Sequence, residues 1–179
     1  MEEKEFIAQL MNPKTQNEAF KKLLSDYQRP LYNHIRNIVI NHDDADDVLQ
    51  NTFIKVFKYI NNFKGESKLF SWMYRIASNE AITFINKRAK LNHIASEALQ
   101  TKLVDNLRAD TYFDGDEIQI KLQNAIALLP RKQQLVFKMR YYEEIKYEEM
   151  SEILSTSVGA LKASYHHAVK KIENYMTTN

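Results

Sequence analysis

The fold is decided near the C-terminus by the stretch Y-E-E-M-S-E-I-L-S-T-S-V-G-A-L-K-A-S-Y-H-H-A-V-K-K-I (147–172). Its apolar residues recur every three or four positions, which predicts a short helix over 147–154 and a long helix after it. The connector is S-T-S (155–157), and Ser157 is a suitable N-cap for the second helix. The stripe that we expect to be buried on this second helix comprises Val158, Leu161, Tyr165, Ala168, Ile172 and Tyr175.

A short helix, a tight turn and a longer helix match the helix-turn-helix unit, whose second helix enters the major groove of DNA. A helix in that groove needs hydrogen-bond donors on its outer side. This one carries Lys162, Ser164, His166 and His167 off its apolar stripe. A plain helical hairpin has the same spacing, so the pattern by itself leaves both interpretations open.

The composition of the 179 residues predicts an all-α protein. Three glycines and three prolines are few, and 44% hydrophobic with 27% charged residues is ordinary for a globular chain. The absence of cysteine excludes disulfides, thiolate zinc sites and cysteine nucleophiles. The start M-E-E-K-E-F is acidic, and the longest apolar run is only Ala125–Leu129. We therefore expect no signal peptide and no membrane insertion, and a cytoplasmic location.

The charges are unevenly distributed along the chain. Residues 64–90 hold six basic and two acidic side chains, and residues 118–179 hold nine and six. The intervening residues 91–117 hold two basic and six acidic ones. This pattern predicts two contact surfaces for a polyanion, joined by an acidic connector that in the free protein covers Lys87, Arg88 and Lys90 or holds the two halves together. Ordinary surface variation is the alternative.

The N-terminal half shows three helical patterns. The first covers residues 15–40, and Pro30 should kink it or divide it. The second begins near Asp43 or Asp44 and ends at 61–65, and the third is capped by Ser67 and ends in the basic run 87–90.

Further along, residues 91–115 read as a linker or a weakly ordered helix. Helical patterns return over 118–129 and again after Pro130. We therefore expect two small helical domains, 1–90 and 118–179, joined by an acidic linker over 91–117.

Two long blocks resemble a known family. The segments D-D-A-D-D-V-L-Q-N-T-F-I-K-V-F (43–57) and N-F-K-G-E-S-K-L-F-S-W-M-Y-R-I-A-S-N-E-A (62–81) resemble region two of bacterial sigma factors. The segment A-L-L-P-R-K-Q-Q-L-V-F-K-M-R-Y-Y-E-E-I-K-Y-E-E-M-S-E-I-L (127–154), continuing to 172, resembles region four. The order and the short linker are similar to the extracytoplasmic-function (ECF) group. The resemblance implies a sigma factor that directs promoter-specific initiation by RNA polymerase.

The resemblance also implies roles for individual residues of the N-terminal block. In the family, a polar surface docks on the clamp helices of core RNA polymerase. The matching positions of this chain are Asp43, Asp44, Asp46, Asp47, Gln50 and Asn51. At the position of Asn51 the family often has an acid. Melting and reading of the minus-ten element are implied for Lys64, Lys68, Arg75, Ser78, Asn79, Lys87, Arg88 and Lys90. Ser78 and Asn79 fall where the family has a short recognition loop that captures a flipped base. Trp72 and Phe70 are expected to be packed.

In the C-terminal block, the resemblance implies reading of the minus-thirty-five element by Ser157, Val158, Gly159, Lys162, Ser164, His166 and His167. Family members often carry arginines where this chain has Ser164 and His167, so an arginine–guanine contact does not carry over. The implied partners are promoter DNA and core RNA polymerase, through its clamp helices and flap region. An anti-sigma factor, which holds many family members inactive, is a further partner to test.

Two other classes of function are compatible with parts of the sequence. His34 with H-D-D (42–44) faintly resembles a metal-dependent helical phosphohydrolase, but a second, distant ligand set is missing from the sequence. We therefore expect no catalytic residue, metal or cofactor, and no enzyme. The other alternative is a two-domain helix-turn-helix regulator that does not act as a sigma factor.

Overall fold

The computed structural model describes residues 2–179, apart from the side chain of residue 97, and within these residues it is helical without strands. The order is α1 (Glu3–Met11), α2 (Gln16–Val39), α3 (His42–Tyr59), η1 (Ile60–Asn62), α4 (Leu69–Leu91), α5 (Ser96–Asp105), η2 (Leu107–Ala109), α6 (Glu117–Ala127), α7 (Arg131–Tyr141), α8 (Tyr147–Leu154) and α9 (Val158–Thr178). The predicted all-α class is confirmed.

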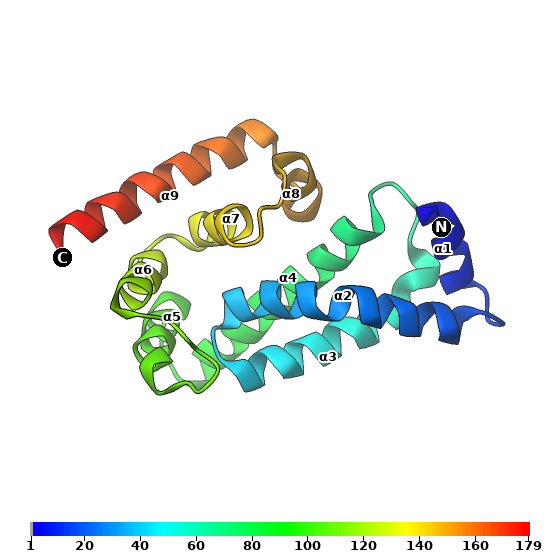
Figure 1. Cartoon of the computed structure of the whole chain (residues 1–179), viewed down its shortest axis with the longest axis horizontal. Helices are drawn as coiled ribbons and strands as arrows, with labels where there is room; N and C mark the ends of the chain where they lie inside the picture. Colours follow the sequence, from blue (N-terminus) through cyan, green and yellow to red (C-terminus); the bar gives the residue numbers. More distant parts are fainter. Residues whose placement is uncertain (1) are drawn as a thin grey trace.

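The N-terminal half is a bundle in which α2, α3 and α4 lie side by side and α1 crosses one end (Figure 1). Its centre consists of fully buried aliphatic side chains, among them Leu31, Ile35 and Met73. The predicted helix over 15–40 forms as the single helix α2, so its division at Pro30 is wrong. Pro30 is exposed, so water can reach the carbonyl that its missing N–H leaves free.

The predicted cap at Ser67 is also wrong. The N-cap position of α4 is Lys68, whose side chain makes no capping hydrogen bond. Instead, the Leu69 N–H donates to Glu3 Oε1 at 2.9 Å. The Glu3 carboxylate of α1 therefore accepts a hydrogen bond from a backbone N–H that has no partner within α4. Its negative charge also interacts favourably with the positive end of the α4 helix dipole.

The acidic segment between the two blocks is folded onto them rather than free. It forms α5, which packs against α4 and α6, and it buries Leu99, Val104 and Leu107. Asp110 accepts from Arg36 Nη2 at 2.6 Å, and the Tyr112 ring stacks on His42 with centroids 3.7 Å apart. Burial disfavours the Asp110 carboxylate, but the Tyr112 N–H and the Arg36 guanidinium outweigh it and hold the pKa of Asp110 below its usual range.

The C-terminal half contains the predicted helix-turn-helix. Helix α8 has the predicted bounds, and Ser155 at its end has a φ of 50°, in the left-handed region that ends a helix and turns the chain. Ser157 Oγ accepts from the Ala160 N–H at 3.2 Å, which confirms the predicted N-cap of α9. Leu161, Ala168 and Ile172 of the predicted stripe are buried, and Val158, Tyr165 and Tyr175 are partly buried.

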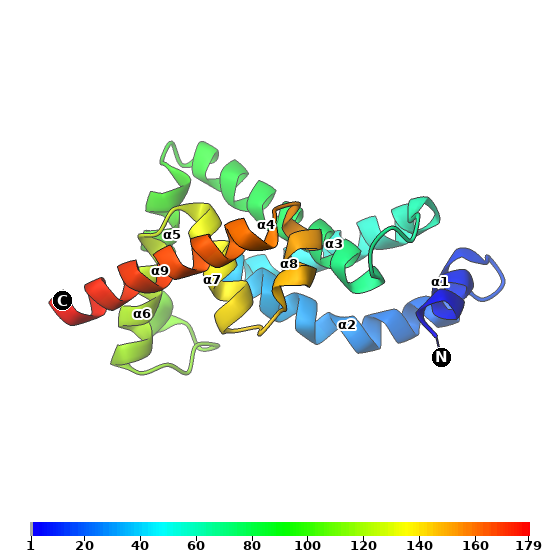
Figure 2. The same cartoon turned by 90° about the horizontal axis from the view of Figure 1, so that it is seen from above.

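The two halves pack on each other. One hydrophobic cluster includes α2, α3 and α4 of the first half together with Val136 and Met139 of α7, Met150 and Ile153 of α8, and Leu161 of α9. Helix α8 lies against α4, as the view from above also shows (Figure 2). The seam between the halves therefore has an apolar interior that excludes water.

Candidate partner-docking and nucleic-acid interface

Helix α3 turns a polar face to solvent. Asn41 caps the helix by accepting from the Asp44 N–H at 3.1 Å. Four of the six predicted docking residues are exposed, and their spacing places them on one face of the helix: Asp43, Asp47, Gln50 and Asn51. Ile54 continues the same face one turn after Gln50 and Asn51 and is 64% exposed. Sequence reasoning missed Ile54, although its position outside the stripe Leu49, Phe53, Val56, Phe57 and Ile60 was the available signal.

The other two predicted docking residues point elsewhere. Asp44 pairs with Arg88 of α4, and burial raises the pKa of its carboxyl even though Arg88 opposes that change. Asp46 Oδ2 lies 3.4 Å from His42 Nε2. Asp44 therefore joins α3 to α4, and Arg88, which was predicted to contact phosphate, is already partnered.

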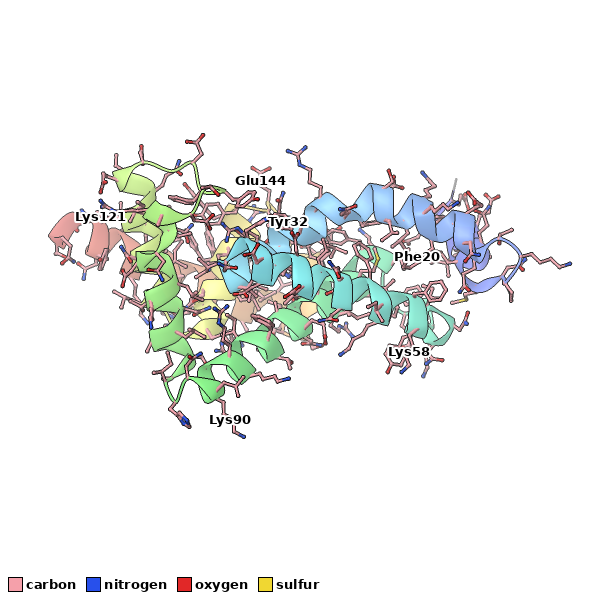
Figure 3. The ribbon with its side chains drawn as sticks, turned by 90° about the horizontal axis from the view of Figure 1, so that it is seen from below. Phe20, Tyr32, Lys58, Lys90, Lys121 and Glu144 are labelled. Atoms are coloured by element: carbon pink, nitrogen blue, oxygen red, sulfur yellow. The ribbon has the colours of Figure 1, made fainter. Side chains whose placement is uncertain are left out.

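Several predicted DNA-binding residues line one side of α4. The helix makes close to two turns from Lys68 to Arg75 (seven residues), one turn on to Asn79 (four residues) and three turns on to Lys90 (eleven residues). Asn79, Lys87 and Lys90 are exposed, as is Lys64 before the helix. Figure 3 shows Lys90 at the tip of α4, pointing away from the bundle. None of the acidic side chains predicted to cover Lys87 and Lys90 pairs with them among the described residues.

The N-terminal part of this side is in contact with α8. Lys68 Nζ lies 2.9 Å from Glu149 Oε1, and Glu149 raises the pKa of Lys68. Arg75 donates through Nη2 to the carbonyl of Glu152. Both partners belong to the predicted helix-turn-helix, so these two cations are engaged by the other half of the chain.

Ser78 and Asn79 lie inside α4 rather than in a loop, which corrects the expectation drawn from the family. Ser78 is 2% exposed, and its Oγ donates to the Tyr74 carbonyl at 2.8 Å and lies 2.7 Å from His34 Nε2. The Nδ1 atom of His34 lies 3.0 and 2.9 Å from the two oxygens of Glu143. Ser78 is therefore part of a buried polar network, whereas Asn79 keeps a free amide.

The aromatic residues of α4 are packed as expected. Trp72 is half-buried with its ring 5.2 Å from that of Phe63, and the Phe70 ring lies 4.1 Å from that of Tyr74. The burial of Tyr74 itself, which contacts His34, strongly raises its pKa.

On α9, most of the residues that are predicted to read the minus-thirty-five element are exposed to solvent. Gly159, Lys162, His166 and His167 are exposed, and Val158 and Ser164 are half-buried. Lys162 Nζ lies 5.7 Å from the centre of the Tyr147 ring, which places it beside the first residue of α8. The rings of His166 and His167 are 6.0 Å apart and tilted by 57°. Within residues 2–179, no three His, Asp or Glu side chains gather in a way that could hold a metal ion.

The chain is similar to known proteins over most of its length. Residues 23–91 match the family described as Sigma-70 region 2, and residues 119–172 match Sigma-70, region 4. Over 165 residues it is 28% identical to the ECF RNA polymerase sigma-E factor of Haemophilus influenzae, covering 88% of this chain and 87% of that protein. Over 161 residues it is 28% identical to the ECF RNA polymerase sigma factor SigW of Bacillus subtilis, covering 86% of each.

Solved structures share the fold. CnrH, in complex with the cytosolic domain of CnrY, superimposes with a TM-score of 0.71 at 17% identity, over 99% of this chain and 98% of that one. The sigma factor RpoE of Bartonella quintana, in complex with the anti-sigma factor NepR, gives 0.65 at 19% identity, over 89% and 98%.

With both regions matched in order, the chain belongs to the ECF sigma factors. It is a sigma factor that binds core RNA polymerase and directs promoter-specific transcription initiation, and the alternative of a regulator without sigma activity is not supported. Among residues 2–179, none of the helices combines the length and the apolar character needed to cross a membrane.

Proposed function

We propose that the exposed face of α3 binds the clamp helices of core polymerase. The observation that carries this proposal is Ile54, which is 64% exposed and lies one turn after Gln50 and Asn51 on the face that also carries Asp43 and Asp47. Protein interfaces combine apolar contacts with polar residues that stay near solvent, and this face offers both. The exposed carboxylates of Asp43 and Asp47 fit a basic partner surface and steer its approach.

Replacement of Ile54 by aspartate tests this docking face. Because Ile54 packs against little of its own chain, Ile54→Asp should fold normally and weaken binding to core polymerase by at least about ten-fold. Ile118→Asp is the matched control, since Ile118 is 67% exposed on α6 rather than on α3. Equal affinity of both variants for core polymerase would exclude α3 as the docking helix.

We propose that one side of α4 holds the melted minus-ten element. This side carries Lys68, Arg75, Asn79 and Lys90, and it acts together with Lys64 and Lys87. The lysines contact phosphates, and the free amide of Asn79 can both donate and accept at a base edge. Asn79→Ala should weaken discrimination among minus-ten variants by about 1–3 kcal/mol. Since Asn79 is exposed, stability should change by less than about 0.5 kcal/mol. Thr83→Ala, exposed one turn further along α4, is the control, and equal discrimination by the two variants would remove Asn79 from the site.

In the second half, α9 is proposed to read the minus-thirty-five element through Lys162 and His166, with Gly159 allowing the backbone to approach the DNA. The region-four block also supplies the contact with the polymerase flap region. Further parts of the proposal are an anti-sigma partner, as in the RpoE structure of Bartonella quintana, action in the cytoplasm and the lack of a catalytic activity of its own.

A further inference from the structure

We propose that a cleft between α2 and the end of α7 binds a phosphate-bearing small molecule of about the size of a nucleotide. The cleft has a volume of about 540 Å³, which is within the range of sites for small ligands and cofactors. Its walls come from α2, from Tyr74 of α4, and from Tyr142 and Glu143, which follow α7. None of the residues proposed to bind polymerase or DNA lines this cleft, so the proposal goes beyond those functions.

The α2 wall of the cleft carries hydrogen-bond donors on one face. Arg29, Asn33 and Arg36 follow one another at spacings of four and three residues, which places them on one side of the helix. Arg29 and Asn33 are exposed, and their side chains make no hydrogen bond or ion pair within residues 2–179. The two arginines are about 10 Å apart along the helix axis. Since guanidinium groups pair well with phosphate oxygens, this spacing suits an extended anion with more than one charged group.

Two further donors of the lining are buried. Arg36 donates through Nη2 to Asp110 at 2.6 Å, but its Nη1 is buried and has no partner in the described part of the chain. Tyr74 is 4% exposed, and its hydroxyl makes no hydrogen bond there either. Burial raises the pKa of Tyr74, so the hydroxyl keeps its proton and can donate. Buried donors without acceptors are destabilising, and an oxyanion in the cleft supplies acceptors for them.

The carboxylate that lines the cleft, Glu143, is already engaged. It accepts from His34 Nδ1 at 2.9 Å and from Asn37 Nδ2 at 3.3 Å, and its side chain is only 9% exposed. The buried ammonium group of Lys138 acts on Glu143 from the α7 side and offsets its charge. The free polar groups of the cleft are therefore mostly donors, which favours an oxyanion over a cation as the ligand.

Tyr142 gives the cleft an aromatic rim. It is 38% exposed, and its hydroxyl accepts from Gln123 Nε2 at 3.0 Å. Its ring packs edge-on against the rings of Phe137 and Tyr141, with interplanar angles of 89° and 82°. A ring that is held in this way offers a surface on which a nucleobase can stack while the phosphates contact the arginines.

Calorimetric titration of the whole chain tests this site, with ATP, tripolyphosphate and adenosine as the probes. Arg29→Gln removes an exposed guanidinium, and Tyr74→Phe removes only a hydroxyl. The matched controls are Arg108→Gln and Tyr165→Phe, because neither Arg108 nor Tyr165 lines the cleft. Circular dichroism checks the folding of each variant. Because Arg29 is exposed, Arg29→Gln keeps the test decisive even if Tyr74→Phe does not fold.

We expect ATP and tripolyphosphate to bind to one saturable site, and adenosine not to bind. Arg29→Gln and Tyr74→Phe should each weaken the binding of ATP by about ten-fold, because each loses a hydrogen bond to a charged group, and the controls should not. Bound ATP should also raise the midpoint of urea unfolding, since it binds only the folded protein. Tighter binding of ATP than of tripolyphosphate would assign the ligand to the nucleotides, and equal binding would assign it to the polyphosphates; either supports a phosphate site.

Three results would overturn the proposal. The first is no binding of either phosphate probe, the second is adenosine binding as tight as that of ATP, and the third is equal affinity of the site variants and their controls for ATP. A single-stranded oligonucleotide is the remaining probe. If Arg29→Gln weakens its binding as much as that of ATP, the cleft belongs to the path of DNA, and a small-molecule site is excluded.

Discussion

Lys138 provides a test of the packing between the two halves. It lies on α7 with 4% of its surface exposed, and its Nζ donates to the Asn37 carbonyl of α2. Burial lowers the pKa of Lys138 to about 8, although the nearby Glu143 carboxylate favours the charged form. At neutral pH the folded protein therefore carries a buried ammonium group that an unfolded chain would expose to water.

The size of the effect follows from the two pKa values. Between about pH 8 and pH 10.4, Lys138 is neutral in the folded protein but still protonated in the unfolded chain. Because the unfolded state then binds more protons, the free energy of unfolding rises with pH, by about 2 kcal/mol from pH 7 to pH 9.5. Lys138→Met should abolish this rise and stabilise the protein at pH 7.

Urea unfolding followed by the fluorescence of the single tryptophan, Trp72, measures this dependence. The series must stop near pH 9.5, because burial raises the pKa of Tyr142 to about 12 and that of Tyr74 further, so tyrosine ionisation destabilises the folded state at higher pH. Lys132→Met, at an exposed lysine of the same helix, should keep the rise. A rise of the same size in Lys138→Met would show that Lys138 is not the group that causes it.

Three further predictions concern single contacts. Ser157→Ala removes the N-cap of α9 and should lower the free energy of unfolding by about 1 kcal/mol in urea titrations; an unchanged midpoint would show that the cap is replaceable. Asp110→Asn should speed hydrogen exchange over residues 106–113 by weakening the pair with Arg36, whereas the exposed Asp114→Asn should not; equal rates would mean that the pair does not hold the linker. Gly159→Ala meets no atom within 4 Å, so it should fold normally yet weaken promoter binding; full promoter affinity would contradict close backbone approach at Gly159.

The features that were predictable from sequence are those set by neighbours along the chain. The bounds of α8 and the cap at Ser157 depend on side chains within a few residues, and both were predicted. The cap of α4 was missed because its acceptor, Glu3, lies 66 residues away. Helix α5 was ambiguous because its weak pattern is stabilised by burial of Leu99 and Val104 against other helices.

The candidate site follows the same rule. The residue types on α3 and α4 could be read from the sequence. Whether each side chain is exposed to a partner, or is already paired or buried, could not. Arg88 is paired with Asp44, and Ser78 is buried against His34, through contacts that only the packing of separate helices creates. Ile54 is different, because its position off the apolar side of α3 was a signal in the sequence, and it was missed because isoleucine is among the most often buried residues.

The most direct test of the central conclusion is transcription by core RNA polymerase on a library of promoter fragments, with and without this chain. We expect discrete transcript starts that require the chain, from fragments that share two sequence elements upstream of the start, and a loss of minus-ten discrimination with Asn79→Ala. Transcription no different from that of core polymerase alone, with the added chain folded, would contradict it.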